Sequence, residues 1–264
     1  MAMFTKRGAE AVTSATTEKD DDNSVILPFT SGTTYKVRFK SAEDSVEYYA
    51  YGIFGKVNTF VPKVPSERNA KGFVTDNPTI WDRASELLYA EAKAAKDAGD
   101  DDTYEKIRKQ AYLLKGKPKY LVAFVNLADG QYGVVDLTPK QASGVFATIQ
   151  KYAKRLDKLA FELSKTGSST NTTVSLTPIL DMDEELTEQE RKNFEAADAL
   201  EPFDFALFET CLYVADEAEQ TKNLEIAGFD IRRLGLSSEA AATAADGAVT
   251  PLPKNDGNKP EIIF

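Results

Sequence analysis

Aromatic and cationic side chains are interleaved in the first half of this 264-residue sequence. Flat aromatic rings can hold unpaired nucleobases by stacking, and lysine and arginine can pair with the phosphates between them. The combination therefore predicts a surface that binds single-stranded nucleic acid. The candidate residues are Lys36, Arg38, Tyr48, Tyr49, Tyr51, Phe54, Lys56, Lys63, Lys115, Lys117 and Lys119.

Many of these aromatic residues could instead belong to the hydrophobic core. Successive side chains of a strand point to opposite faces, so Tyr49 and Tyr51 share one face and Tyr48 lies on the other. The three rings cannot all stack on bases from one surface. We expect about half of the aromatic set to be structural.

The sequence lacks the common catalytic motifs. It has no phosphate-binding loop, no dinucleotide-binding glycine pattern and no nucleophile elbow. It also has no histidine, and Cys211 is its one cysteine, which excludes histidine-based acid–base chemistry, a disulfide framework and an ordinary Cys/His zinc site. Cys211 lies among apolar residues and is interpreted as a small buried hydrophobe. We expect a non-catalytic protein with no metal and no cofactor.

One acidic cluster leaves a different function open. Asp181, Asp183, Glu184 and Glu185 are dense enough to hold a divalent cation, as a metal-dependent enzyme acting on a phosphate substrate would require. Clustered acids at the start of a helix more often complement the helix dipole.

The net charge of −10 is unevenly distributed. Residues 181–220 contain 14 Asp/Glu and only two cations, Arg191 and Lys192, whereas residues 104–158 contain 11 Lys/Arg and four acids. A basic region of this kind favours polyanion binding. We expect the acidic region to compete with nucleic acid for the cationic surface.

The pattern of apolar residues predicts an α+β domain over residues 24–236. Strands are expected at 24–29, 33–40, 120–126, 132–136 and 171–179, with the aromatic-rich segment 45–60 between them. A pair of helices forms an insertion at about 76–116. A long helix from Thr138 to about Leu163, opened by an N-cap and a first-turn proline, and helical stretches at 187–198 and 204–213 follow.

The two ends of the chain have a different composition. Residues 1–23 are expected to be a flexible basic arm and linker, with Phe4, Lys6 and Arg7 available for protein contacts. Residues 237–264 are expected to be a disordered tail, because they are poor in large apolar residues until the last few. The tip, Glu261, Ile262, Ile263 and Phe264, predicts a peptide that docks into a partner protein. The alternative is that it packs back onto its own domain.

This layout resembles the single-stranded-DNA-binding proteins of tailed phages, in particular the T4-like replication and recombination family. Residues 3–7 resemble the short basic motif of that family, and residues 34–39 resemble its first barrel strand. Residues 117–125, followed by a turn, a strand and the helix from Thr138, are similar to its strand–strand–helix core. The resemblance extends over about residues 1–180.

The resemblance implies a fold and several partners. It implies an OB-like five-stranded β-barrel with a helical insertion and C-terminal helices, and self-association along DNA through the N-terminal arm. The C-terminal Glu-Ile-Ile-Phe resembles tips that recruit replication or recombination proteins. One departure is clear: the family carries a zinc ribbon, but residues 76–81 hold no zinc ligand pair. The insertion must then be held by apolar packing, for which we expect Trp81, Leu87 and Leu88.

The expected function is sequence-tolerant binding of single-stranded DNA in support of DNA replication, recombination and repair. No run of 18 apolar residues is present, so no membrane partner is expected. The expected compartment is the cytoplasm, which is that of the infected host cell for a phage-encoded protein. The alternative is a virion structural or assembly protein that acts through contacts between its copies.

Overall fold

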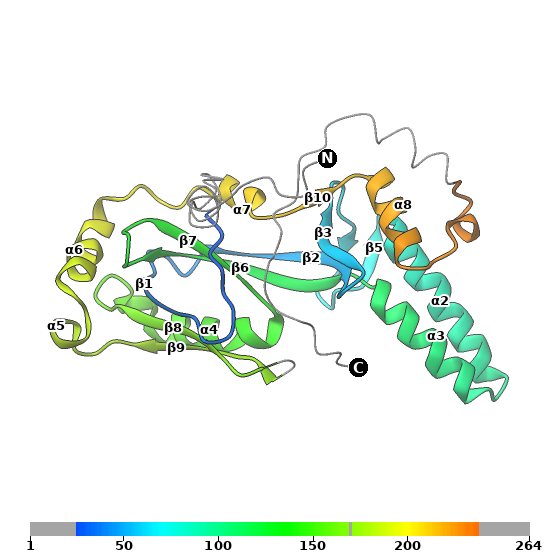
Figure 1. Ribbon diagram of the computed structural model, residues 1–264, viewed down its shortest axis with the longest axis horizontal. Helices are drawn as coiled ribbons and strands as arrows, with labels where there is room; N and C mark the ends of the chain where they lie inside the picture. Colours follow the sequence, from blue (N-terminus) through cyan, green and yellow to red (C-terminus); the bar gives the residue numbers. More distant parts are fainter. Residues whose placement is uncertain (1–24, 169–170, 238–264) are drawn as a thin grey trace, which may run out of the picture.

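The computed structural model describes residues 25–168 and 171–237, and these form a mixed α+β structure (Figure 1). Its strands build a large, mostly antiparallel sheet and a separate two-stranded sheet, β4–β5. The strands are β1 (Thr34–Arg38), β2 (Ser45–Ile53), β3 (Val57–Pro62), β4 (Glu67–Arg68), β5 (Val74–Asp76), β6 (Lys117–Asn126), β7 (Tyr132–Leu137), β8 (Phe161–Thr166), β9 (Thr173–Pro178) and β10 (Val214–Ala215).

The strand β6 is the centre of the large sheet. Along one edge, the first half of β6 pairs with β2 and the last two residues of β6 pair with β1. Along the other edge, β6 pairs with β7. Residues Leu121 to Val125 are almost fully buried, which is the burial expected of a strand covered on both faces. The central strand expected at residues 120–126 is confirmed.

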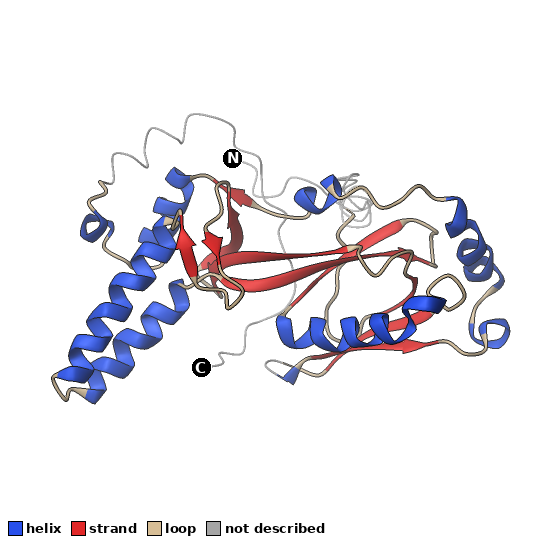
Figure 2. Cartoon of the chain, turned by 180° about the vertical axis from the view of Figure 1, so that it is seen from behind, coloured by secondary structure: helices blue, strands red, loops and turns tan. Residues whose placement is uncertain are grey.

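The helices gather at both ends of the sheet and across one face of it (Figures 1 and 2). They are α2 (Ile80–Asp97), α3 (Asp101–Leu114), α4 (Pro139–Tyr152), α5 (Met182–Glu185), α6 (Glu188–Ala196), α7 (Ala206–Thr210) and α8 (Glu217–Ile226), with the 3-10 turns η1 (Ala153–Arg155), η3 (Ala197–Ala199) and η4 (Ile231–Leu234).

The helices α2 and α3 form a hairpin that projects from one end of the sheet (Figure 2). Thr79 caps α2 through a reciprocal capping box with Asp82, and Asp100 caps α3 by accepting from the Thr103 N–H at 3.0 Å. Gly99, with φ of 78°, provides the left-handed turn between them. The paired helices expected at about 76–116 are present.

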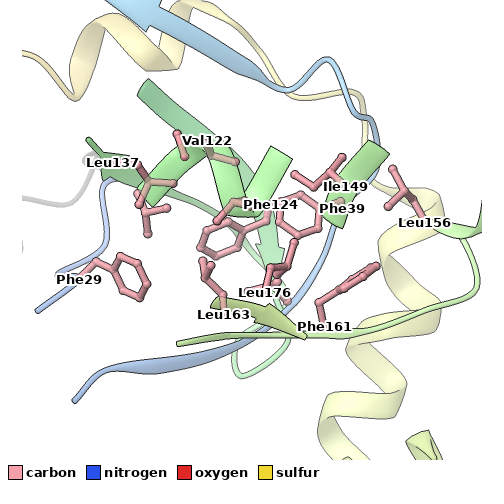
Figure 3. Close-up of a cluster of buried hydrophobic side chains, with 14 residues drawn as sticks. Phe29, Phe39, Val122, Phe124, Leu137, Ile149, Leu156, Phe161, Leu163 and Leu176 are labelled. Carbon is pink, nitrogen blue, oxygen red and sulfur yellow. The ribbon is translucent and has the colours of Figure 1, made fainter. Parts of the chain in front are cut away.

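Two main hydrophobic cores lie along the sheet. In the first, Val145 and Ile149 of α4 pack on Phe39, Phe124 and Phe161 of the strands and their flanks (Figure 3). In the second, the helical hairpin and α8 pack on β2 and β3 around Trp81, which is fully buried. Leu88 is also buried there, and Leu87 is partly buried against the same cluster. The expected packing of the insertion is therefore observed.

The sheet does not confirm the expected five-stranded OB-like barrel. Its order is β10-β3-β2-β6-β1-β8-β9, with β7 branching from β6, and it is not a closed barrel. Within the described residues it contains eight strands rather than five.

The helix expected from Thr138 to Leu163 is too long. It ends at Tyr152 and η1, and residues 161–166 form β8 instead. Phe161 and Leu163 are buried while Glu162 between them is exposed, which is the two-residue period of a strand. Helix α8 was not expected at all. The strand expected at 24–29 is reduced, within the described residues, to a bridge between Ile26 and Val134.

The predictions for the two ends of the chain concern residues that the structure does not describe, apart from Ser237. Phe4, Lys6, Arg7 and the tip Glu261–Phe264 lie outside the described residues, as do the arm and linker 1–23 and all of the tail except Ser237. Among the described helices, none has the length and apolar character needed to cross a bilayer.

The burial of Trp81 predicts a large loss of stability on truncation. Its indole N–H donates to the Gln220 carbonyl at 2.9 Å, so Trp81→Ala removes packing and a hydrogen bond that joins α2 to α8. We expect the free energy of unfolding, measured with urea, to fall by about 3–5 kcal/mol. The exposed Lys93→Ala on the same helix is the control and should change it by less than about 0.5 kcal/mol. Equal effects of the two variants would contradict this view of the hairpin.

Candidate nucleic-acid interface

Phe54 and Lys56 lie at the tip of the β2–β3 hairpin. Gly52 and Gly55 have φ of 145° and 73°, and a Cβ at Gly52 would lie 3.0 Å from the Asn58 carbonyl oxygen. Glycine therefore permits both the tight turn and the close approach of the two strands. The turn leaves the Phe54 ring 81% exposed, and Lys56 is also exposed.

This hairpin forms one wall of a groove of about 640 Å³. The end of α3 contributes Tyr112, which is 57% exposed. The start of β6 contributes Lys117 and Lys119, and the start of α4 contributes Thr138 and Pro139. The groove thus brings two exposed aromatic rings and two lysines together from three elements, the β2–β3 hairpin, α3 and β6.

The two lysines have different electrostatic surroundings. The Lys117 ammonium lies 4.9 Å from the centre of the Tyr112 ring, and partial burial lowers the pKa of its side chain. Lys117 forms no ion pair with another residue of the described chain, so its ammonium has no counter-charge there. Lys119, in contrast, pairs with Asp136.

A second set of aromatic and cationic side chains lies along α3. Tyr104, Arg108 and Tyr112 are spaced i, i+4 and i+8, which places them in one stripe, and Lys115 follows directly after the last residue of the helix. Lys96 of α2 lies 5.0 Å and Arg108 lies 5.8 Å from the centre of the Tyr104 ring. This α3 stripe (Tyr104, Arg108, Tyr112 and Lys115) shares Tyr112 with the groove.

Tyr51 lines the groove but belongs to the core. It is 3% exposed, with its ring 5.7 Å from Phe60 and 6.2 Å from Trp81. Its hydroxyl donates to Asp82 at 2.7 Å and accepts from Arg68 at 2.7 Å, and burial together with the nearby Asp82 charge raises its pKa to about 12. Its ring face is therefore not available to a base.

Tyr48 and Tyr49 lie on opposite faces of β2, as the alternation requires, and both are half-buried. Tyr48 packs in a third cluster and donates to Asp136 at 3.0 Å, and burial raises the pKa of its hydroxyl. The Tyr49 ring lies 4.2 Å from the Arg68 guanidinium. Both rings are used in contacts within the protein.

Lys36 and Arg38 do not reach the groove. Lys36 pairs with Glu190 at 3.0 Å, and Arg38, 2% exposed, donates to the Phe194 carbonyl and pairs with Asp198. The acidic segment that contains α5, α6 and η3 covers this face of β1. Both side chains are therefore paired within the protein, and the Arg38 guanidinium is buried, where a charge requires partners. Their expected phosphate contacts stay a prediction.

The remaining predicted lysines lie at the surface or near it. Lys63 is exposed just after β3, where its backbone N–H donates to the Ala215 carbonyl at 2.8 Å. Lys115 is half-buried, with its ammonium 5.7 Å from the Phe73 ring.

Sequence reasoning missed several residues of this surface. Tyr104, Arg108 and Tyr112 were not assigned to it, although their four-residue spacing on a predicted helix could have indicated a shared face. Phe73 and Tyr89 are 59% and 36% exposed. They lie in separate elements, so no helical spacing in the sequence relates them. Only the packing of β4–β5 against α2 brings them near each other.

The acidic cluster 181–185 forms the N-cap and the single turn of helix α5. Asp181 caps α5 by accepting from the backbone N–H groups of Asp183 and Glu184, at 3.2 and 3.1 Å. In the described part of the chain, no three acidic or cysteine side chains are grouped closely enough to hold a metal ion.

No protein-family model, curated protein or solved structure matches the chain.

The network around Asp82 predicts an acid-sensitive fold. Burial alone would raise the pKa of Asp82, but hydrogen bonds from Ser66 and Tyr51 and the ion pair with Arg68 at 2.8 Å outweigh it and lower that pKa. A carboxylate of this kind stabilises the fold above its unfolded pKa of about 4, and this contribution is lost as pH falls through the lower folded pKa.

We therefore expect Asp82→Asn to lower the free energy of unfolding at neutral pH and to reduce its dependence on pH below about pH 4. Denaturant unfolding of both proteins over this range measures the effect. Parallel curves for the variant and the wild type would show that Asp82 does not contribute. Asp101→Asn, at the exposed start of α3, is the control for loss of one charge.

Proposed function

We propose that this protein binds single-stranded DNA without catalysis and with little dependence on sequence. The observation that carries the proposal is the groove, where the exposed rings of Phe54 and Tyr112 lie beside Lys117 and Lys119. Rings of this kind hold bases by stacking and the lysines bind phosphates, and neither contact reads base identity strongly.

The groove favours single strands over duplex for a physical reason. The faces of the bases are stacked on one another inside a duplex, so an aromatic side chain can reach them only in an unpaired strand. Each stacked base contributes about 1–3 kcal/mol. The phosphate contacts add affinity by releasing counterions, which makes binding sensitive to salt.

The α3 stripe extends the proposed binding surface. From Tyr104 to Tyr112 it covers about 12 Å of helix axis. Glu105 pairs with Arg108 at 3.1 Å, but both side chains are about half exposed, and an exposed pair of this kind contributes little. A phosphate can therefore replace Glu105 as the partner of Arg108.

We also propose a kinship with OB-type folds in an open form. The five strands β7, β6, β1, β8 and β9 pair in antiparallel order, and α4 contacts β6, β7 and β9. In a closed barrel the two outer strands of such a set would pair with each other. Here α4 lies between them and contacts both. This supports an elaborated, opened OB-like sheet as the framework.

The cellular role that fits best is support of DNA replication, recombination and repair. In this proposal the arm residues Phe4, Lys6 and Arg7 mediate self-association along DNA, and the tip Glu261–Phe264 recruits replication or recombination proteins. Both roles rest on the sequence and its resemblance alone. A cytoplasmic site of action, in an infected host cell for a phage-encoded protein, fits the same proposal.

A second candidate is a virion structural or assembly protein. Leu180 is 81% exposed and Phe205 is 50% exposed, and neither lines the groove. Exposed apolar residues of this kind are suited to contacts between copies. Stable oligomers without affinity for nucleic acid would favour this candidate.

Fluorescence anisotropy with labelled oligo(dT) tests the main proposal. We expect tight binding that weakens steeply as salt is raised, with an affinity for duplex DNA of the same length at least about tenfold lower. Equal affinity for single strands and duplex would rule the proposal out.

Variants of the groove test its position. We expect Phe54→Ala and Tyr112→Ala each to lower oligo(dT) affinity by about 1–3 kcal/mol, because each removes one stacking face. Lys117→Ala should reduce the slope of log affinity against log salt by about 0.7. Phe205→Ala removes a comparably exposed ring outside the groove and serves as the control. If it weakens binding as much as Tyr112→Ala does, the DNA lies elsewhere.

A further inference from the structure

A second cavity, of about 480 Å³, opens between the β4–β5 hairpin and α2. Phe73 and Tyr89, both exposed, are among its lining residues, and Lys115 lines it with an ammonium 5.7 Å from the Phe73 ring. Rings and a cation are thus combined here as they are in the groove. We call this space the β5–α2 cavity.

The inner end of the β5–α2 cavity is rigid and electrically balanced. Arg68 and Asp82 line it and pair with each other at 2.8 Å, with both side chains only 7% exposed. Gly72 packs so closely that a Cβ there would lie 2.5 Å from the Tyr49 hydroxyl oxygen. These contacts fix the β4–β5 hairpin against β2 and α2, so the cavity is formed before any ligand arrives.

Two carboxylates give the β5–α2 cavity a specific hydrogen-bonding character. Asp76 and Glu86 line it and are exposed. The backbone N–H of Asn77 donates to Asp76 Oδ1 at 2.8 Å, which fixes that carboxylate. Carboxylates only accept hydrogen bonds, so a group with donors is favoured beside them and a carbonyl oxygen is disfavoured.

Lys115 links the β5–α2 cavity to the groove. It lines the cavity and Lys117 lines the groove, and the backbone at Lys115 is extended, with φ of −66° and ψ of 135°. Two residues of extended chain span about 6.6 Å. A single nucleic-acid strand can therefore place neighbouring phosphates on the two lysines and bases in the two spaces.

We propose that the β5–α2 cavity holds one nucleobase of the bound strand and prefers a base with an exocyclic amino group, cytosine in particular. The base packs against Phe73 and Tyr89, its phosphate lies on Lys115, and its amino group donates to Glu86 or Asp76. Acidic side chains accept from the cytosine amino group in the same way in other protein–DNA contacts. This inference rests on the proposed binding of single-stranded DNA.

The test compares oligo(dC), oligo(dU) and oligo(dT) of about 12 nucleotides by anisotropy at neutral pH. Cytosine and uracil differ at position 4, where an amino group replaces a carbonyl oxygen, and uracil and thymine differ by one methyl group. We expect oligo(dC) to bind about five- to tenfold more tightly than oligo(dU), and oligo(dU) and oligo(dT) to bind alike. Glu86→Ala and Asp76→Ala together should reduce the dC/dU ratio to about one.

Glu105→Ala is the matched control, because it removes an exposed carboxylate from the neighbouring helix outside the β5–α2 cavity. It should raise affinity for all three strands equally and leave the dC/dU ratio unchanged. Equal binding of oligo(dC) and oligo(dU) by the wild type overturns this inference while the proposed function stands. A ratio unaffected by the double substitution also overturns it. Failure to bind any of the three strands overturns the proposed function itself.

Discussion

The pairing of β6 on both edges is the constraint on which the rest of the structure depends. Its buried residues, Leu121 to Val125, join the core under α4 to the strands that carry the helical hairpin. Its half-buried start, Lys117 to Lys119, lies in the groove. Lys117 and Lys119 pair with Ala50 and Tyr48 of β2, and the chain from Tyr120 onward pairs with β7 as well, so the two lysines are held between the β2–β3 hairpin and α3. The proposed binding surface is therefore preformed, which reduces the entropy cost of binding.

The acidic segment has a structural role that the net charge conceals. Glu190 and Asp198 pair with Lys36 and Arg38 of β1, and these contacts hold α6 and η3 against that strand. Among the described residues, the salt bridges of this segment reach β1 and not the groove lysines. The competition with nucleic acid expected from the charge pattern stays a prediction. Part of the acidity is required to compensate a guanidinium that folding has buried.

Local signals predicted much of the fold. The helix starts at Thr79 and Thr138 carry capping boxes, and the apolar run in β6 is long enough to mark a central strand. The prediction failed where a local pattern was short or ambiguous. The apolar spacing of α4 was extended to Leu163, although Phe161 and Leu163 alternate with polar residues in β8. A run of six residues competes poorly with a longer helical pattern before its tertiary partners are known.

The sequence by itself determined which chemistry is available: rings and cations in one half of the chain, acids in another, and no histidine. Only the tertiary structure decided which of these side chains face outward. Tyr51 and Arg38 are buried, whereas Phe54, Tyr112 and Lys117 meet in one groove from three separate elements. The reason is physical. The period of a strand or a helix fixes which residues share a face. The elements from distant parts of the sequence that pack on that face determine whether it becomes core or surface.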